Sequence, residues 1–79
     1  MLDHLRGLRE DKDLKQKNMA ELLGIAQSAY SDYERGKRNI PNDILKKLAL
    51  FHETSIDYIL ELTDDPRPYP RRKKRPWEK

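Results

Sequence analysis

Residues 16–35 read QKNMAELLGIAQSAYSDYER, and this stretch decides the fold. Its pattern predicts two short helices, over 16–23 and 27–35, joined by a tight turn. Gly24 follows the first helix, where a left-handed residue is favoured and glycine adopts that conformation without a side-chain penalty. Ala20 is small enough to let the two helices approach closely. The stretch therefore predicts a helical hairpin with a sharp bend.

The second helix of this hairpin has two unlike faces. At about 100° per residue, its polar side chains fall within one arc of roughly 140°, and these residues are Gln27, Ser28, Ser31 and Asp32. Tyr30 and Tyr33 point about the opposite way, so we expect them in the core. A helix held in this manner fits the DNA major groove while its neighbour crosses the backbone. An ordinary hairpin with a solvated polar face explains the turn equally well.

The composition allows one small domain. Of 79 residues, 35% are hydrophobic and 39% are charged, which favours a small all-α bundle. The absence of cysteine excludes disulfides and cysteine-ligated metal, and it suits a reducing cytoplasm. No apolar run exceeds four residues, so no membrane span is predicted. His4 and His52 do not have metal-ligand spacing, so we expect no metal site. The glycines form no phosphate-binding loop and no Ser/His/Asp arrangement is indicated, so we expect no enzyme, cofactor or small-molecule ligand.

The net charge of +3 is unevenly distributed along the chain. Residues 1–62 hold ten Lys and Arg against eleven Asp and Glu, a net charge of −1, whereas 63–79 hold seven against three, a net charge of +4. The second segment also holds four prolines and the run RRKKR at 71–75. We therefore predict a domain over 1–62 and a proline-rich basic tail over 63–79, extended and largely disordered.

Three further helices complete the predicted bundle. The first spans about residues 2–12, with leucines at a spacing of three. Asn42, after Pro41, is expected to cap the fourth helix, whose buried side would hold Ile44, Leu45, Leu48, Ala49 and Phe51. Ser55 is expected to cap a short fifth helix.

With five helices and these residues in order, the chain resembles the Cro/C1-type (XRE) helix-turn-helix family of phage and bacterial repressors. The resemblance covers about residues 4–62. It is carried by LRGLRED in the first helix, by Gln16 with Ala20 and Gly24, by QSAYSDYERGKR at 27–38, by Pro41, and by LALFHETSIDYIL at 48–60. It implies a compact five-helix bundle of the lambda-repressor-like DNA-binding type. It also implies a cytoplasmic, nucleoid-associated regulator of bacterial or phage origin that binds double-stranded DNA.

The resemblance implies roles for individual residues. Glutamine pairs with adenine and aspartate accepts from cytosine N4, and the residues implied to read bases are Gln27, Ser28, Ser31 and Asp32. The residues implied to hold phosphates are Lys15, Gln16, Lys17, Lys37, Arg38 and Asn39. Arg9 and Glu34 match a pair that forms an internal salt bridge with a structural role.

The chain departs from the family pattern at three positions. Lys15 and Ala26 stand where serine or threonine usually caps the second and third helices, and each lost cap costs about 1 kcal/mol. Asp13 replaces the usual glycine after the first helix, and aspartate tolerates the left-handed conformation better than most residues.

Two features leave alternatives open. The basic run Arg71, Arg72, Lys73, Lys74 and Arg75 is either a solubilising terminus or an arm that follows DNA phosphates or a minor groove. One hairpin contacts few base pairs, so we expect a weak homodimer on a palindromic operator with half-sites about 34 Å apart. Apolar residues left over for that contact are Leu50, Tyr58 and Leu62. The alternative function is an antitoxin-type or other interaction module whose tail binds a protein partner.

Overall fold

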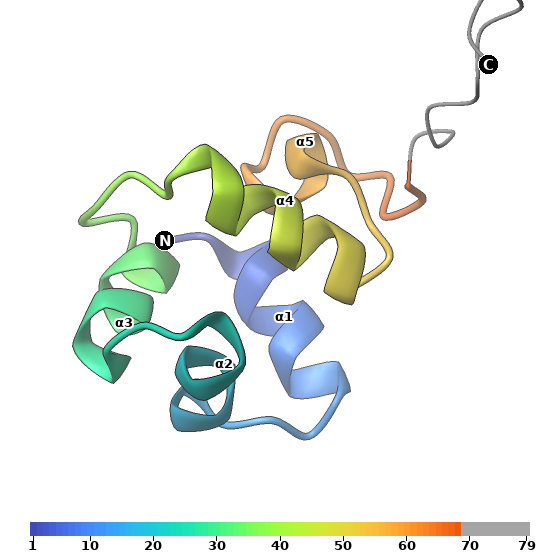
Figure 1. Cartoon of the computed structure of the whole chain (residues 1–79). Helices are drawn as coiled ribbons and strands as arrows, with labels where there is room; N and C mark the ends of the chain where they lie inside the picture. Colours follow the sequence, from blue (N-terminus) through green and yellow to red (C-terminus); the bar gives the residue numbers. More distant parts are fainter. Residues whose placement is uncertain (69–79) are drawn as a thin grey trace, which may run out of the picture.

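The computed structural model describes residues 1–68, which form five helices and no strand. In chain order they are α1 (Asp3–Asp11), α2 (Gln16–Leu23), α3 (Gln27–Arg35), α4 (Asn42–Phe51) and α5 (Ile56–Ile59). The α2–α3 pair lies at one end of the bundle and the α4–α5 pair at the other, with α1 between them (Figure 1). The predicted all-α bundle is confirmed, and α2 and α3 have the predicted bounds.

The turn between α2 and α3 is built on Gly24. Its φ of +69° is left-handed, and its N–H donates to the Glu21 carbonyl at 3.2 Å. Ile25 N–H donates to the Ala20 carbonyl at 3.0 Å, which completes the end of α2. Ala20 is only 3% exposed, as expected for a small residue where α2 and α3 pack closely. The local sequence therefore sets the angle at which α3 is presented.

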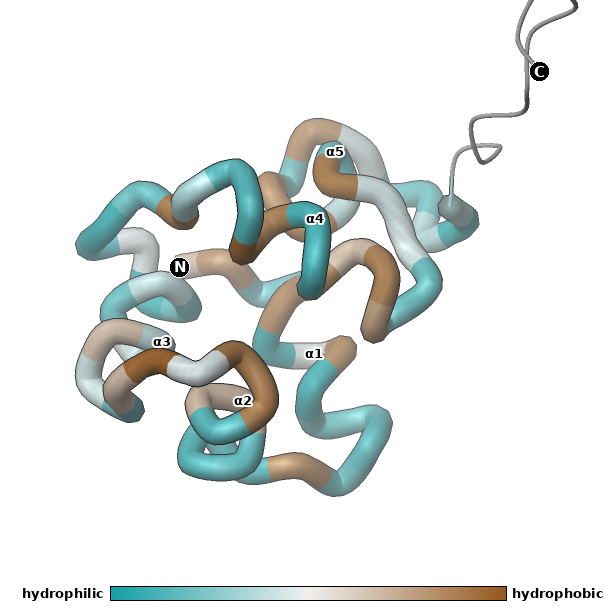
Figure 2. Tube along the Cα trace, viewed as in Figure 1, coloured by the Kyte–Doolittle hydropathy of each residue, from teal (hydrophilic) through white to brown (hydrophobic). Residues whose placement is uncertain are grey.

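One apolar core joins all five helices. Each helix contributes one fully buried hydrophobic side chain, and these are Leu5, Met19, Tyr30, Leu48 and Ile59. Hydrophobic and hydrophilic segments alternate along α4 (Figure 2), as burial of one side requires. Tyr33 is 5% exposed, so both tyrosines of α3 lie in the core as predicted.

Local hydrogen bonds accommodate the departures at the helix ends. Asp13 adopts a φ of +56°, as its place after α1 predicts. Lys15 offers no acceptor, but its own N–H donates to Asn18 Oδ1 at 3.0 Å. Ser55 Oγ accepts from Tyr58 N–H at 3.0 Å, so the predicted cap of α5 is confirmed. The predicted cap of α4 is wrong, because extended backbone at Pro41 makes Asn42 the first helical residue.

The end of α4 is more open than the apolar pattern predicts. Phe51, expected on the buried side, is 38% exposed because it is the last residue of α4, where the core ends. The ammonium nitrogen of Lys12 lies 5.2 Å from the centroid of the Phe51 ring and covers that ring in part. Leu50 and Leu62 are more than half exposed. His52, by contrast, is buried.

The chain after α5 stays against the domain rather than leaving it at residue 63. The buried Thr54 hydroxyl donates to the Pro66 carbonyl at 2.7 Å. His4 Nε2 lies 3.5 Å from Asp64 Oδ1, which ties the same segment to α1. Residues 63–68 form no helix or strand, as their prolines predict, but their contacts differ from those of an extended tail. The basic run 71–75 lies outside the described residues.

Candidate nucleic-acid interface

The polar side of α3 faces away from the core. Gln27 and Ser28 are exposed, and Ser31 and Asp32 are half-buried. The opposite side of the helix is anchored by two buried tyrosines, so α3 cannot rotate without moving core side chains. The helix therefore presents its four polar residues as one surface, called here the reading face.

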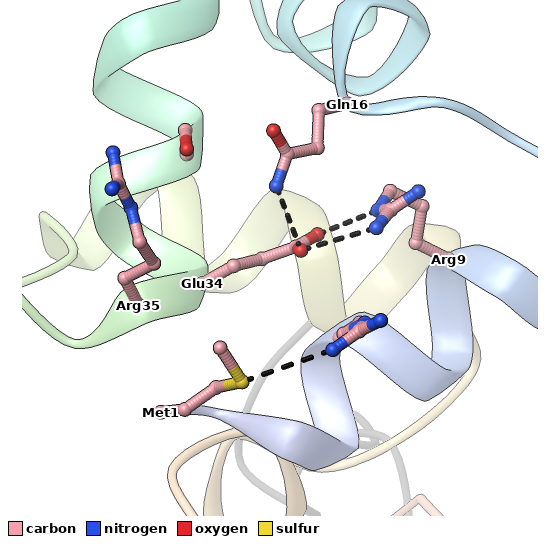
Figure 3. A pocket seen from close by; sticks show the side chains of 7 residues that line it. Met1, Arg9, Gln16, Glu34 and Arg35 are labelled. Carbon is pink, nitrogen blue, oxygen red and sulfur yellow. Dashed lines mark hydrogen bonds and ion pairs between the residues drawn. The ribbon is translucent and has the colours of Figure 1, made fainter.

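The start of α2 lies beside this helix and carries donors. Lys15 and Lys17 are exposed, and Gln16 is half-buried between α1 and α3 (Figure 3). The Gln16 Nε2 group donates to Glu34 Oε1 at 3.1 Å. A side-chain amide carries two N–H groups, and only one of them is used in the bond to Glu34. The backbone N–H groups of the first helical turn favour an anion at the same place.

An internal ion pair holds Gln16 in position. Arg9 Nε donates to Glu34 Oε2 at 2.7 Å, and its Nη2 donates to Oε1 at 3.2 Å (Figure 3). Arg9 Nη1 also donates to the Leu14 carbonyl at 2.8 Å. The two side chains are only 12% and 3% exposed, so the bidentate pair links α1 to α3 inside the domain. This is the contact that the resemblance implies for Arg9 and Glu34.

The charges of this pair are stabilised by each other. Burial alone would raise the pKa of Glu34, but the hydrogen bonds from Arg9 and Gln16 and the positive charge of Arg9 outweigh it, and the pKa is lowered. The Glu34 hydrogen bond raises the pKa of Arg9. Burial, and then the neighbouring carboxylate of Glu34, raises the pKa of Tyr30. Glu34 is therefore ionised and Arg9 protonated near neutral pH, and Gln16 meets a fixed acceptor.

A hollow of about 350 Å³ opens where α1, α2 and α3 meet. It is lined by Met1, Arg6, Arg9, Gln16, Ser31, Glu34 and Arg35. Three guanidinium groups line this hollow against one carboxylate, and that carboxylate is paired with Arg9. Arg6 and Arg35 are paired as well, with Glu10 and Asp32 at 3.4 Å each, so an anion that enters the hollow competes only with exposed ion pairs.

Sequence reasoning missed Arg6 as a lining residue, and it grouped Arg35 with the cations that follow α3 rather than with the reading face. Arg35 lies about 80° around α3 from Gln27 on an ideal helix, inside the arc of the reading face, so the periodicity could have found it. Arg6 precedes Arg9 by three residues and so shares its side of α1. No signal in the sequence alone showed that this side of α1 meets the start of α2.

The loop after α3 supplies further positive charge. Gly36 has a φ of +73°, and Lys37 N–H donates to the Asp32 carbonyl at 2.9 Å. Lys37, Arg38 and Asn39 are all exposed. The left-handed glycine ends α3 and turns these residues out beside the reading face.

Asp32 does not stand alone on the reading face. Its Oδ1 lies 3.4 Å from Arg35 Nη2, and its Oδ2 lies 3.6 Å from Arg38 Nη2. The acid expected to read a base is thus paired with two arginines in this structure.

The histidines lie elsewhere. The His4 ring stacks on Tyr58 with centroids 4.0 Å apart, and its Nδ1 lies 2.7 Å from the Tyr58 carbonyl oxygen.

Among residues 1–68 no group of His, Cys, Asp and Glu is arranged to hold a metal ion. No helix in that part of the chain is long and apolar enough to cross a membrane.

The fold and this face define a class, the small all-α DNA-binding domain that presents one helix beside a neighbour across a tight turn. The helix-turn-helix family model matches residues 5–59, and the chain belongs to this family, in its Cro/C1-type form. It is a family of DNA-binding transcriptional regulators, not of enzymes.

Several bacterial regulators are similar to this chain. It is 46% identical over 69 residues to the uncharacterized HTH-type transcriptional regulator YobD of Bacillus subtilis, covering 87% of this chain and 62% of that protein. It is 41% identical over 59 residues to the B. subtilis HTH-type transcriptional regulator AnsR, covering 75% of this chain and 51% of that protein. The cryptic phage CTXphi transcriptional repressor RstR of Vibrio cholerae is 33% identical over 52 residues, or 66% and 47% of the two chains.

The chain spans about half to three fifths of the length of these curated relatives. The similarity therefore concerns the DNA-binding domain. No solved structure matches the chain significantly.

Proposed function

We propose that this chain is a sequence-specific transcriptional repressor that docks α3 in the major groove of its operator. The observation that carries the proposal is the reading face of α3, held beside the α2 start by Gly24, two buried tyrosines and the Arg9–Glu34 pair. The relatives that are named regulators, and the one named a repressor, support it. Occupying an operator blocks access of polymerase, which is the simplest mode of repression for a DNA-binding domain.

With α3 docked in the groove, the proposed DNA contacts fall into two groups. The base-reading group is Gln27, Ser28, Ser31 and Asp32, because an α3 in the groove presents these to base edges. The phosphate-binding group is Lys15, Gln16, Lys17, Lys37, Arg38 and Asn39, which flank the reading face and position the domain. Arg6 and Arg35 join the second group through the hollow beside Gln16.

We further propose that the chain binds as a weak homodimer on a palindromic operator. A single docked helix reads only a few base pairs, and two copies on half-sites about 34 Å apart supply the missing specificity. Leu50 and Leu62 are 55% and 72% exposed and remain for a contact between copies.

The test is a fluorescence-anisotropy titration against DNA from upstream of the protein's own gene. A scrambled duplex of equal length is the control, at several salt concentrations. We expect a preference of roughly 10³ or more for the upstream DNA. Equal and steeply salt-dependent binding of both would indicate a backbone binder. Absence of binding to either duplex at moderate salt would refute the repressor.

A further inference from the structure

The acid on the reading face is bound to two cations. The Asp32 carboxylate lies between Arg35, on the same helix, and Arg38, in the following loop, at 3.4 and 3.6 Å. Its side chain is 27% exposed, whereas those of the arginines are 48% and 57% exposed. The carboxylate thus lies at the surface beside two arginine side chains that are more exposed than it is.

These two ion pairs are held loosely. At such exposure an ion pair contributes about 0–1 kcal/mol, and both distances exceed the 2.7 Å of the buried Arg9–Glu34 pair. A DNA phosphate offers a guanidinium the same bidentate geometry as a carboxylate. Phosphates can therefore draw Arg35 and Arg38 away from Asp32.

Releasing the arginines has a cost that depends on the DNA sequence. If both remain on Asp32, its negative charge offsets one of the two positive charges that would otherwise lie against the phosphates. If both leave, the carboxylate is bare among phosphates, which repel it. A base edge that donates a hydrogen bond relieves this repulsion, and the donor suited to a carboxylate in the major groove is the N4 amino group of cytosine.

We propose that Asp32 is a specificity residue that acts through Arg35 and Arg38. On non-operator DNA its ion pairs keep the two guanidinium groups from binding phosphates. Where a cytosine amino group donates a hydrogen bond to the Asp32 carboxylate, the two guanidinium groups are released. Two sequence-independent phosphate contacts thereby become conditional on one base pair. This inference rests on the proposed docking of α3 in the major groove.

The experiment compares Asp32→Asn with the Arg35→Gln/Arg38→Gln double variant and with the triple variant. Asparagine keeps the shape of the side chain and removes its charge. Affinity for a scrambled duplex is measured by fluorescence anisotropy at four salt concentrations. Glu53→Gln is the charge-matched control, because Glu53 is exposed and the α4–α5 turn lies across the bundle from α3 (Figure 1).

We expect D32N to bind the scrambled duplex about 5- to 10-fold more tightly than wild type at moderate salt. The slope of the logarithm of its binding constant against the logarithm of the salt concentration should steepen by about 1.8, because two phosphate contacts are gained at about 0.9 each. The affinity of D32N for the operator should increase less than its affinity for the scrambled duplex, so the ratio of the two affinities falls. The triple variant should match the double variant within about twofold, as E53Q should match wild type.

Two results would overturn the inference. The first is an equal gain from D32N in the double-variant background, which would mean that Asp32 only repels phosphates. The second is a D32N variant that binds the operator more weakly than wild type but binds the scrambled duplex equally well. In that case Asp32 would only read a base. Failure of the proposed function looks different, because wild type would then bind operator and scrambled duplexes equally. The salt slopes on scrambled DNA would still decide whether Asp32 restrains the arginines.

Discussion

Replacing His52 with leucine should make the stability of the domain less sensitive to acid. The His52 ring is 7% exposed, and neither ring nitrogen has a hydrogen-bond partner among the described residues. Burial, and then the positive charge of Lys12, lowers its pKa from 6.5 to about 4. The folded domain therefore resists a proton that the unfolded chain accepts readily.

The sign and size follow from the two pKa values. Above about pH 7 the ring is neutral in both states and adds no pH dependence. Between pH 6.5 and 4 the unfolded chain binds the proton and the folded domain does not, so the free energy of unfolding falls as the pH falls. At about 1.4 kcal/mol per pH unit, the loss reaches about 3 kcal/mol near pH 4. That is a large share of the stability of a small domain.

Urea unfolding of wild type and His52→Leu at pH 7.5, 6.5, 5.5 and 4.5 measures this loss. The stability advantage of the leucine variant should grow by about 2–3 kcal/mol from the highest pH to the lowest. Glu34, whose pKa is lowered, keeps its contribution above pH 4.5 and loses it only below, so it does not interfere in this range. Equal pH dependence in the two proteins would refute the reasoning, as would a His52 NMR titration near pH 6.5.

Three further predictions concern the framework of the interface. Glu34→Ala leaves the Arg9 guanidinium buried without its carboxylate and should cost about 3–5 kcal/mol in urea unfolding; a loss under 1 kcal/mol would contradict the structural role. Gly24→Ala meets no atom within 4 Å of the new Cβ. Because the backbone there is left-handed, Gly24→Ala should still lower the free energy of unfolding by about 1–2 kcal/mol. An unchanged melting temperature would show that the turn relaxes. Gln16→Ala should weaken operator and scrambled binding alike by about 10-fold, the loss of one charged hydrogen bond; a loss on the operator alone would make Gln16 a base reader.

Much of the interface follows from local patterns. The 100° periodicity placed Gln27 and Ser28 on the outer side of α3 and the tyrosines on the inner side, and the structure agrees. The same periodicity places Arg35 within the arc of the reading face, although its charge also groups it with the basic loop that follows. Only one of the two partners of Asp32 was predictable in this way. One is three residues away on the helix, but the other lies beyond the left-handed turn at Gly36.

The sequence by itself determined the five helices, the bend at Gly24 and the polar and aromatic sides of α3, because helical periodicity and glycine conformation depend on residues close together in the chain. Tertiary structure decided the pairing of Arg9 with Glu34 and Gln16, the hollow beside them, and the bond from Thr54 to Pro66. It also decided that Phe51 stays partly exposed while His52 is buried. These contacts join residues that meet only after the helices pack, and local pattern carries no information about which side chains fill a shared space.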